Sequence, residues 1–383
     1  MSPTLFLLSI QLSTANNCTF CLPNDGRMTD LNTRKTIRRT RMSAKQAIKQ
    51  IVPRPIWAKL QSVKEAHNGR KAERTQIQRF MRWISLDSST DKERVQTRLA
   101  FDIHRLEKGL SHIHFRLGFG KGVLSEISKR LVLLEKADPA YSANPLYNQG
   151  LAALHEYQQR HEEQGYDLAQ VEAMFPESIW KAAQECKVDD SAANAGSFVM
   201  ESASKVNNLS MGFVQLAQNR YSVREYASKP VSQDLLDKVY EVSMKTPSVC
   251  NRQATRVYQI TDPEKIATAL KIQGGFSGYG MPPVLLLITS DIRAFMNNNE
   301  RNEPFVDGGL FSMSLLYALE AYGLAACPLN AMFSLSQDRK TRALLNIPDY
   351  ELPVMYIAVG NFPESVPVCR STRRDPKAIV KKL

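Results

Sequence analysis

Two arginines and a serine at alternate positions form the first group of residues that could do chemistry. Arg220, Ser222 and Arg224 are spaced by two, so an extended backbone would turn them to one face. Guanidinium groups bind phosphate through paired hydrogen bonds, and a hydroxyl adds a neutral bond to an oxygen of the same ligand. The pattern therefore predicts an anion site.

A second group contains two amides. Asn251 and Gln253 are also spaced by two, and they follow Pro247 and Ser248. Amides both donate and accept hydrogen bonds, which suits the edge of a planar heterocycle. Between the groups, Ser232 precedes apolar residues at helical spacing, which predicts a helix that the proline ends. The alternative is that the arginines are surface charges and the Pro-Ser pair is an ordinary helix stop.

In this order and spacing, the two groups resemble the flavin-dependent nitroreductase family, whose domains begin with Arg-x-Ser-x-Arg and continue to Pro-Ser-x-x-Asn-x-Gln. The resemblance covers about residues 206–383. It implies an α+β, nitroreductase-like FMN-binding domain with a mixed sheet flanked by helices, and NADH or NADPH as the hydride donor. It also implies a homodimer with flavin sites at the interface. The apolar segment Leu310–Tyr322 would be its central helix, buried on every side.

The resemblance also implies which residues bind the flavin. They are Arg220, Tyr221, Ser222, Arg224, Pro247, Ser248, Asn251, Gln253, Leu329, Asn330, Arg373 and Arg374. Backbone N–H groups near Leu329 and Asn330 would serve the N5 edge of the ring, and Arg374 or its rival Arg373 would be the third phosphate ligand. Arg224 would favour the negative charge of the reduced ring. No acid or base is assigned, because flavin and water can carry the protons.

The chain divides into four parts by composition. Residues 1–45 predict a disordered basic segment, residues 46–187 a helical domain, residues 188–205 a linker and residues 206–383 the flavin domain. Apolar periodicity predicts helices over 123–138, 145–163 and 167–186. In the last part, residues 255–260, 284–288 and 353–360 predict strands, and a helix follows Asp262 and Pro263. The helical domain is not part of a minimal nitroreductase-like domain, so we expect it to serve acceptor choice or localisation.

Three histidines near the middle of the helical domain stand out. His104, His112 and His114 lie in a charged, glycine-rich stretch that indicates either an ion-paired helix end or a polar lining for a substrate or partner. Their spacing is not that of a metal site. Cys18 and Cys21 lack a second pair of ligands, so we expect no metal.

Charge and cysteine content bear on location. The net charge is +12, and residues 27–82 hold sixteen Lys or Arg against three acids. This basic arm predicts a solvated segment or a contact with an anionic membrane surface, and no nucleic acid is expected because no nucleic-acid fold accompanies it. Leu5–Ile10 makes a poor signal peptide, so a reduced, cytoplasmic protein is expected.

These observations predict an FMN-dependent oxidoreductase that uses NAD(P)H to reduce a small acceptor by a two-step hydride mechanism. A nitro compound, a quinone, an enone or a biosynthetic intermediate would all fit as the acceptor. The alternative is a flavin-binding or degenerate scaffold that recruits partners or a membrane surface through the helical domain.

Overall fold

The structure is a computed structural model that describes residues 53–83, 85–186 and 195–383. The chain divides into two units, residues 1–61 and 62–383, and the first is described only where helix α2 (Arg54–Trp83) begins. The predicted disordered segment 1–45, with Cys18 and Cys21, lies outside the described residues. So do residues 187–194 of the predicted linker.

Helices make up the region before the linker. They are α3 (Lys92–Leu110), α4 (Lys121–Ala137), α5 (Pro145–Glu162), α6 (Ala169–Glu172) and α7 (Glu177–Gln184), with a short 3-10 helix at Tyr141–Ala143. Asp91 begins α3 by accepting a hydrogen bond from the Arg94 N–H, and Asn144 begins α5 in the same way. Leucines such as Leu106, on the apolar face of α3, are fully buried in one core shared with α4, α5 and α7.

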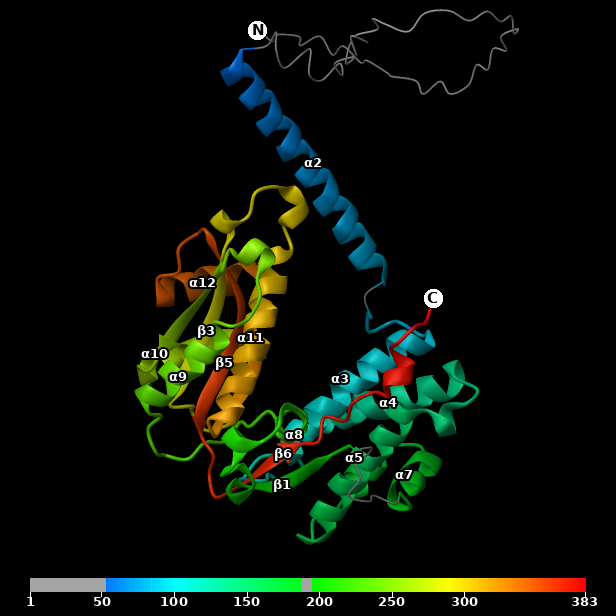
Figure 1. The fold of residues 1–383 in the computed structure, drawn as a ribbon. Coiled ribbons are helices and arrows are strands. Elements are labelled where there is room, and N and C mark those ends of the chain that lie inside the picture. Colours follow the sequence, from blue (N-terminus) through cyan, green and yellow to red (C-terminus); the bar gives the residue numbers. More distant parts are fainter. Residues whose placement is uncertain (1–52, 84, 187–194) are drawn as a thin grey trace, which may run out of the picture. The chain divides into compact units, whose positions relative to one another are not determined.

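A four-stranded sheet with two helices on each face forms the second region (Figure 1). Its strands, in order, are β2 (Thr255–Ile260), β3 (Val284–Asp291), β5 (Glu351–Asn361) and β4 (Leu324–Asn330). Helices α9 (Gln233–Ser243) and α11 (Glu303–Ala321) pack on one face, and α10 (Pro263–Gln273) and α12 (Leu335–Leu345) pack on the other. The predicted α+β class is confirmed.

Strand direction differs from the prediction of a mixed sheet. Every strand pair in the described residues is antiparallel. Central strand β3 is buried along its whole length, as its apolar run predicts. A central strand is buried on both faces of the sheet whether its neighbours run parallel or antiparallel to it. Its apolar run therefore does not predict the direction of the neighbouring strands.

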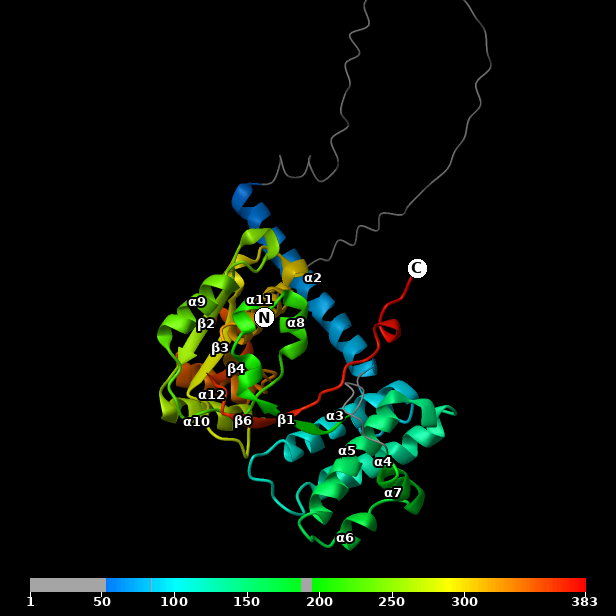
Figure 2. The same cartoon turned by 60° about the horizontal axis from the view of Figure 1, so that its bottom comes forward.

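A two-stranded ribbon replaces part of the predicted linker. Residues Ser197–Glu201 form β1, which pairs antiparallel with β6 (Ser365–Cys369), and Figure 2 shows the two strands side by side. Pairing with a distant strand gives this short segment its structure, and its own sequence has no strong strand pattern. Two 3-10 helices, Ser202–Lys205 and Asn208–Ser210, then lead to α8 (Phe213–Asn219).

Helix α11 is buried on one side only. Gly308 lies against Val354 of β5, where an added Cβ would come 2.7 Å from the valine Cγ2. Its other side exposes Phe305, Val306, Leu310 and Met313. We call these four residues the α11 stripe. The prediction of a helix buried all round therefore holds for only one face of the single chain.

Among the described residues, no helix combines the length and the apolar character that a membrane span requires.

Candidate functional site

The first motif runs beside strand β4. The chain becomes extended at Arg220, directly after α8. The Val223 N–H donates to the Ala326 carbonyl of β4 at 3.0 Å, and Ala227 bridges to Asn361 of β5. The motif is thereby attached to the strand that ends in Leu329 and Asn330.

The positive charge of Arg373 acts on Arg220. Burial lowers the pKa of the Arg220 guanidinium, and the positive charge of Arg373 lowers it further. Arg220 makes no hydrogen bond to any residue that the structure describes, and Arg373 donates to the Ser371 carbonyl. Two neighbouring cations favour an anion that both can bind, so the pair fits a phosphate group. Arg373 and Arg374 both line a cavity of about 400 Å³ at the helical region, and Arg373 is the one whose positive charge lowers the pKa of Arg220.

Arg224 is turned into the protein. It is buried, with Nη1 at 3.3 Å from the Cys369 sulfur and 3.4 Å from the Ser222 carbonyl oxygen. Its guanidinium also lies 5.9 Å from the centre of the Tyr279 ring. This packing fixes the position of the charge. Tyr221, in contrast, packs edge-on against a phenylalanine of β1 and belongs to a small apolar core.

The second motif forms a tight loop between α9 and β2. Ser248 Oγ accepts a hydrogen bond from the Gln253 N–H at 3.0 Å. Cys250, Asn251 and Gln253 all have positive φ angles, of 49°, 54° and 51°. Such angles are costly for residues other than glycine and concentrate at functional sites. The loop leaves the amide residues Asn251 and Gln253 exposed.

An aspartate that the sequence analysis did not single out holds this loop. The buried Asp307 carboxylate accepts from the Val249 N–H at 3.1 and 3.2 Å. It also lines a cavity of about 30 Å³ together with Pro247, Ser248 and Gln253. The Asp-Gly-Gly sequence before the apolar helix was the available signal.

The two motifs lie at opposite ends of α11. Asp307 holds the second motif near the start of the helix. Glu320, near its end, pairs with the Lys205 ammonium at 2.7 Å, and that ammonium also bonds the carbonyl of Asn219, the neighbour of Arg220. Thirteen residues separate the two acids, about 20 Å at the usual helical rise. One chain therefore does not bring the two motifs together.

The end of helix α3 packs beside the first motif. The Tyr279 hydroxyl donates to the Lys108 carbonyl at 2.8 Å, and the Lys108 ammonium donates to the Gly275 carbonyl at 3.3 Å. His112 stacks on the Tyr279 ring, with centroids 4.1 Å apart. Two of the three histidines that stand out in the sequence therefore have partners. His112 contacts Tyr279, and His104 lies against Glu107. His114 is exposed.

A family model matches this second region. The model described as "Nitroreductase family" covers residues 217–276 and 276–361. These ranges contain both motifs and the sheet, and exclude the helical region, Arg373 and Arg374.

Two relatives and two solved structures are each similar to part of this chain. The FMN reductase [NAD(P)H] of Bacillus subtilis is 26% identical over 155 residues, which is 37% of this chain and 61% of that protein. This chain therefore spans less than two thirds of that relative. The NADH dehydrogenase of Thermus thermophilus is 25% identical over 175 residues, 38% of this chain and 83% of the relative.

A nitroreductase family protein from Clostridium difficile 630 matches with 23% identity and a TM-score of 0.38, covering 45% of this chain and 98% of that chain. An FMN-dependent nitroreductase from Clostridium difficile R20291 matches with 18% identity and a TM-score of 0.35, covering 40% and 88%.

Proposed function

We propose that this chain, whose C-terminal region is a nitroreductase-family domain, is an FMN-dependent oxidoreductase that takes hydride from NADH or NADPH and reduces a small acceptor. The observation that carries the proposal is the Arg220–Arg224 segment, which lies extended beside strand β4 in the region that matches this family, with the charge of Arg373 acting on Arg220 from outside that region. The names of the two relatives, an FMN reductase and an NADH dehydrogenase, agree with this chemistry.

Each part of the site has its own task. FMN, when bound, supplies the ring that accepts and donates hydride. Arg220 and Arg373 would hold its phosphate, and the amides of Asn251 and Gln253 would orient its ring. Arg224 would stabilise negative charge on the reduced ring from a fixed position, which avoids reorganisation during the reaction.

A second copy of the chain completes the site in this proposal. The α11 stripe is apolar and exposed, with Leu310 at 47% exposure. Pairing two α11 helices antiparallel about a two-fold axis would cover both stripes. It would also set the Pro247–Gln253 loop of one protomer beside Arg220 and Arg224 of its partner. The separation of the two motifs within one chain supports this arrangement.

The proposal also includes a class of acceptor and a location for the protein. A nitro compound, a quinone or an enone all accept hydride equivalents and fit an enzyme of this kind. We place the protein in the cytoplasm. The basic arm would contact an anionic membrane surface, where the attraction weakens as salt rises.

The test starts from purified full-length protein. We expect it to be yellow, and to bleach when NADH or NADPH is added without oxygen. Arg220→Ala should weaken FMN binding by about 1.5–3 kcal/mol, roughly 10- to 150-fold in Kd, because a charge-assisted bond is lost. Arg70→Ala, which removes an exposed arginine of α2, is the matched control. A colourless protein that cannot be loaded with FMN would contradict the proposal.

A further inference from the structure

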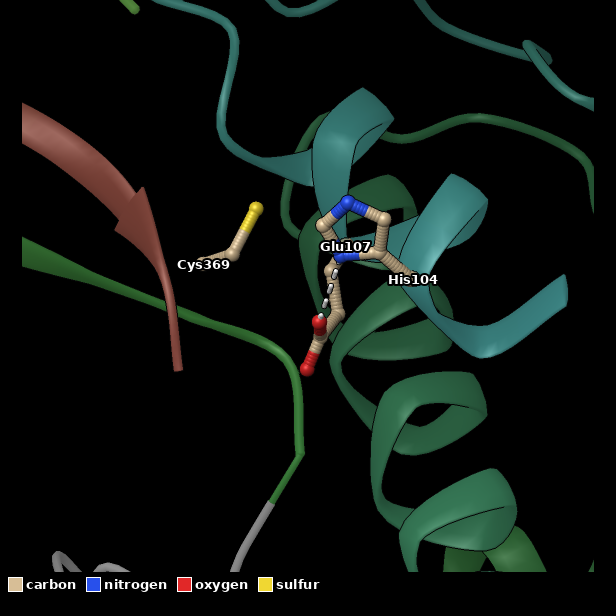
Figure 3. Close-up of side chains that lie close together, drawn as sticks. All are labelled: His104, Glu107 and Cys369. Atoms are coloured by element: carbon tan, nitrogen blue, oxygen red, sulfur yellow. Dashed lines mark ion pairs between the residues drawn. The ribbon is translucent and has the colours of Figure 1, made fainter. Parts of the chain in front are cut away.

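Three possible metal ligands meet where helix α3 lies against the end of β6. His104 and Glu107 are one turn apart on α3, and Cys369 is the last residue of β6. One ligand atom from each, a ring nitrogen, a carboxylate oxygen and the sulfur, all lie within 4.8 Å of one another. Figure 3 shows Cys369 projecting from the strand toward the His104–Glu107 pair.

One carboxylate oxygen of Glu107 makes no hydrogen bond to a described residue. The side chain is 3% exposed, and its Oε1 accepts from the Gly196 N–H at 3.0 Å. Its Oε2 lies 3.6 Å from His104 Nδ1, too far for a hydrogen bond, and bonds no other described residue. Glu107 also lines the cavity of about 400 Å³, so this oxygen is available to a cation that enters from there.

The sulfur has polar neighbours of the kind that surround a metal-bound thiolate, with Arg224 as a donor. Cys369 is buried, with its Sγ at 3.3 Å from Arg224 Nη1 and 3.5 Å from Ser111 Oγ. Hydrogen-bonded partners behind a ligand orient it and tune its basicity. In the same way, the Gly196 N–H donates to Glu107 Oε1 from outside the cluster. Two of the three ligands are thus held from behind by residues outside the cluster.

The choice of ligands selects the metal. One imidazole, one carboxylate and one thiolate suit zinc and similar transition metals, and magnesium or calcium would require oxygen ligands. The positive charges of Lys108 and Arg224 near the sulfur oppose any loosely held cation. A metal here must form short bonds to charged ligands. Glu107 and the Cys369 thiolate together supply two negative charges.

We propose that His104, Glu107 and Cys369 bind one zinc-class divalent metal ion through three protein ligands, with a fourth position open to the adjoining cavity. His104 is 43% exposed, and both helix residues line the cavity of about 400 Å³. Three protein ligands with one open position are typical of zinc sites that also take water or an added ligand. Binding would release the thiol proton of Cys369 to solvent.

The test measures zinc binding to full-length protein that has first been dialysed against a chelator. Calorimetric titration with Zn²⁺ in two buffers of different ionisation enthalpy gives both stoichiometry and proton release. We expect one zinc per chain with release of a proton. His104→Gln, Glu107→Gln and Cys369→Ser should each weaken binding by more than the roughly 10- to 100-fold that loss of an outer partner causes.

Matched controls separate this site from other zinc ligands in the chain. His114→Gln and the double variant Cys18→Ser, Cys21→Ser should bind zinc like the wild type. FMN content, measured in parallel, reports on the flavin site; because Cys369 contacts Arg224, His104→Gln is the variant that should lose zinc and keep FMN. His104→Gln changes a half-exposed side chain, so it should fold even if the two buried substitutions do not.

Two results would overturn the proposal. One is a wild-type chain that takes up no stoichiometric zinc. The other is zinc binding that survives in His104→Gln or is lost in the Cys18, Cys21 double variant, since the metal would then lie elsewhere.

Discussion

The two ends of helix α11 hold the two motifs in different ways. At its start, Asp307 accepts hydrogen bonds from a neutral backbone N–H of an exposed loop. At its end, Glu320 is paired with a buried ammonium, Lys205, and also accepts from Asn208 at 3.1 Å. One end depends on a strained loop and the other on a buried ion pair. The helix thus carries two half-sites whose stabilities rest on different forces.

This difference indicates why the site would need two chains. The Arg220 end is packed, since the ion pair, strand β4 and the end of α3 all lie beside it. The Asn251 end presents amides on a loop with three positive φ angles. Each chain carries one packed anion site and one exposed amide loop. When two chains pair antiparallel, the anion site of one would lie beside the amide loop of the other, which gives two complete sites.

Complementation between two damaged chains has the largest expected effect. Arg220→Ala and the double variant Asn251→Ala, Gln253→Ala should each give homodimers with two weakened FMN sites. When both are expressed together, a mixed dimer has one site with both defects and one with none. We expect tight FMN binding to return in half of the sites of purified mixed dimers. Differently tagged chains allow the mixed dimer to be isolated and its flavin to be counted.

A site built within a single chain gives the opposite result. Every site would then carry one defect, and the mixed dimer would bind FMN as weakly as its parents. Co-expression of Arg220→Ala with Arg70→Ala is the control for expression and mixing, since the intact motifs of Arg70→Ala also leave one complete site in that dimer.

Truncation of the two acids tests the different forces at the helix ends. Glu320→Ala would leave the Lys205 ammonium buried without its charge partner, which should cost about 3–5 kcal/mol of unfolding free energy. Asp307→Ala would leave one backbone N–H without its partner, at a cost of about 1–3 kcal/mol. Chemical denaturation of both variants beside the wild type measures the two losses.

A double variant provides the control for the ion pair. Glu320→Leu with Lys205→Met removes both charges and should recover much of the stability lost in Glu320→Ala. Equal losses in the two single variants, or no recovery in the double variant, would contradict the distinction between the ends.

The sequence predicts the elements whose signals are local. Helices α4 and α5 and strands β2, β3 and β5 follow from apolar periodicity, caps and breakers near the predicted positions. The single helix predicted over 167–186 is instead two, α6 and α7, with Pro176 at the start of the second. The α+β class and the nitroreductase resemblance follow from two short motifs. In each case the residues that carry the signal are close together in the chain.

Features that depend on distant residues could not be predicted in this way. Strand β1 is a strand because β6 pairs with it. In the sequence, Glu320 is a single charge in an apolar helix, and its partner Lys205 is identified only in the folded structure. In the same way, Cys369 joins His104 and Glu107 only through the packing of β6 on α3. The spacing of the histidines alone argued against a metal, because one candidate ligand lies far along the chain.

The smallest expected effect concerns pH at the Arg220 end, where His112 stacks on Tyr279. Burial lowers the pKa of His112, and the positive charges of Lys108, Arg116 and Arg224 lower it further. The Glu225 carboxylate, 3.9 Å away, opposes them only in part, because burial raises its own pKa. The native state therefore binds fewer protons here than the unfolded chain, whose histidines titrate near pH 6.5.

Acidification should therefore destabilise the native state. The contribution of His112 is fully present above the unfolded pKa of about 6.5 and is lost as the pH falls toward the lower native value. We expect Tm to drop between about pH 7.5 and 5.5, and to drop less in His112→Gln. Burial also lowers the pKa of His161. His161 should therefore contribute part of the drop in Tm in both the wild type and His112→Gln. His67→Gln, at an exposed position of α2, should match the wild type. An equal drop in His112→Gln and wild type would show that His112 has the same pKa in the native and unfolded states, and that its stacking on Tyr279 does not link the helical region to pH.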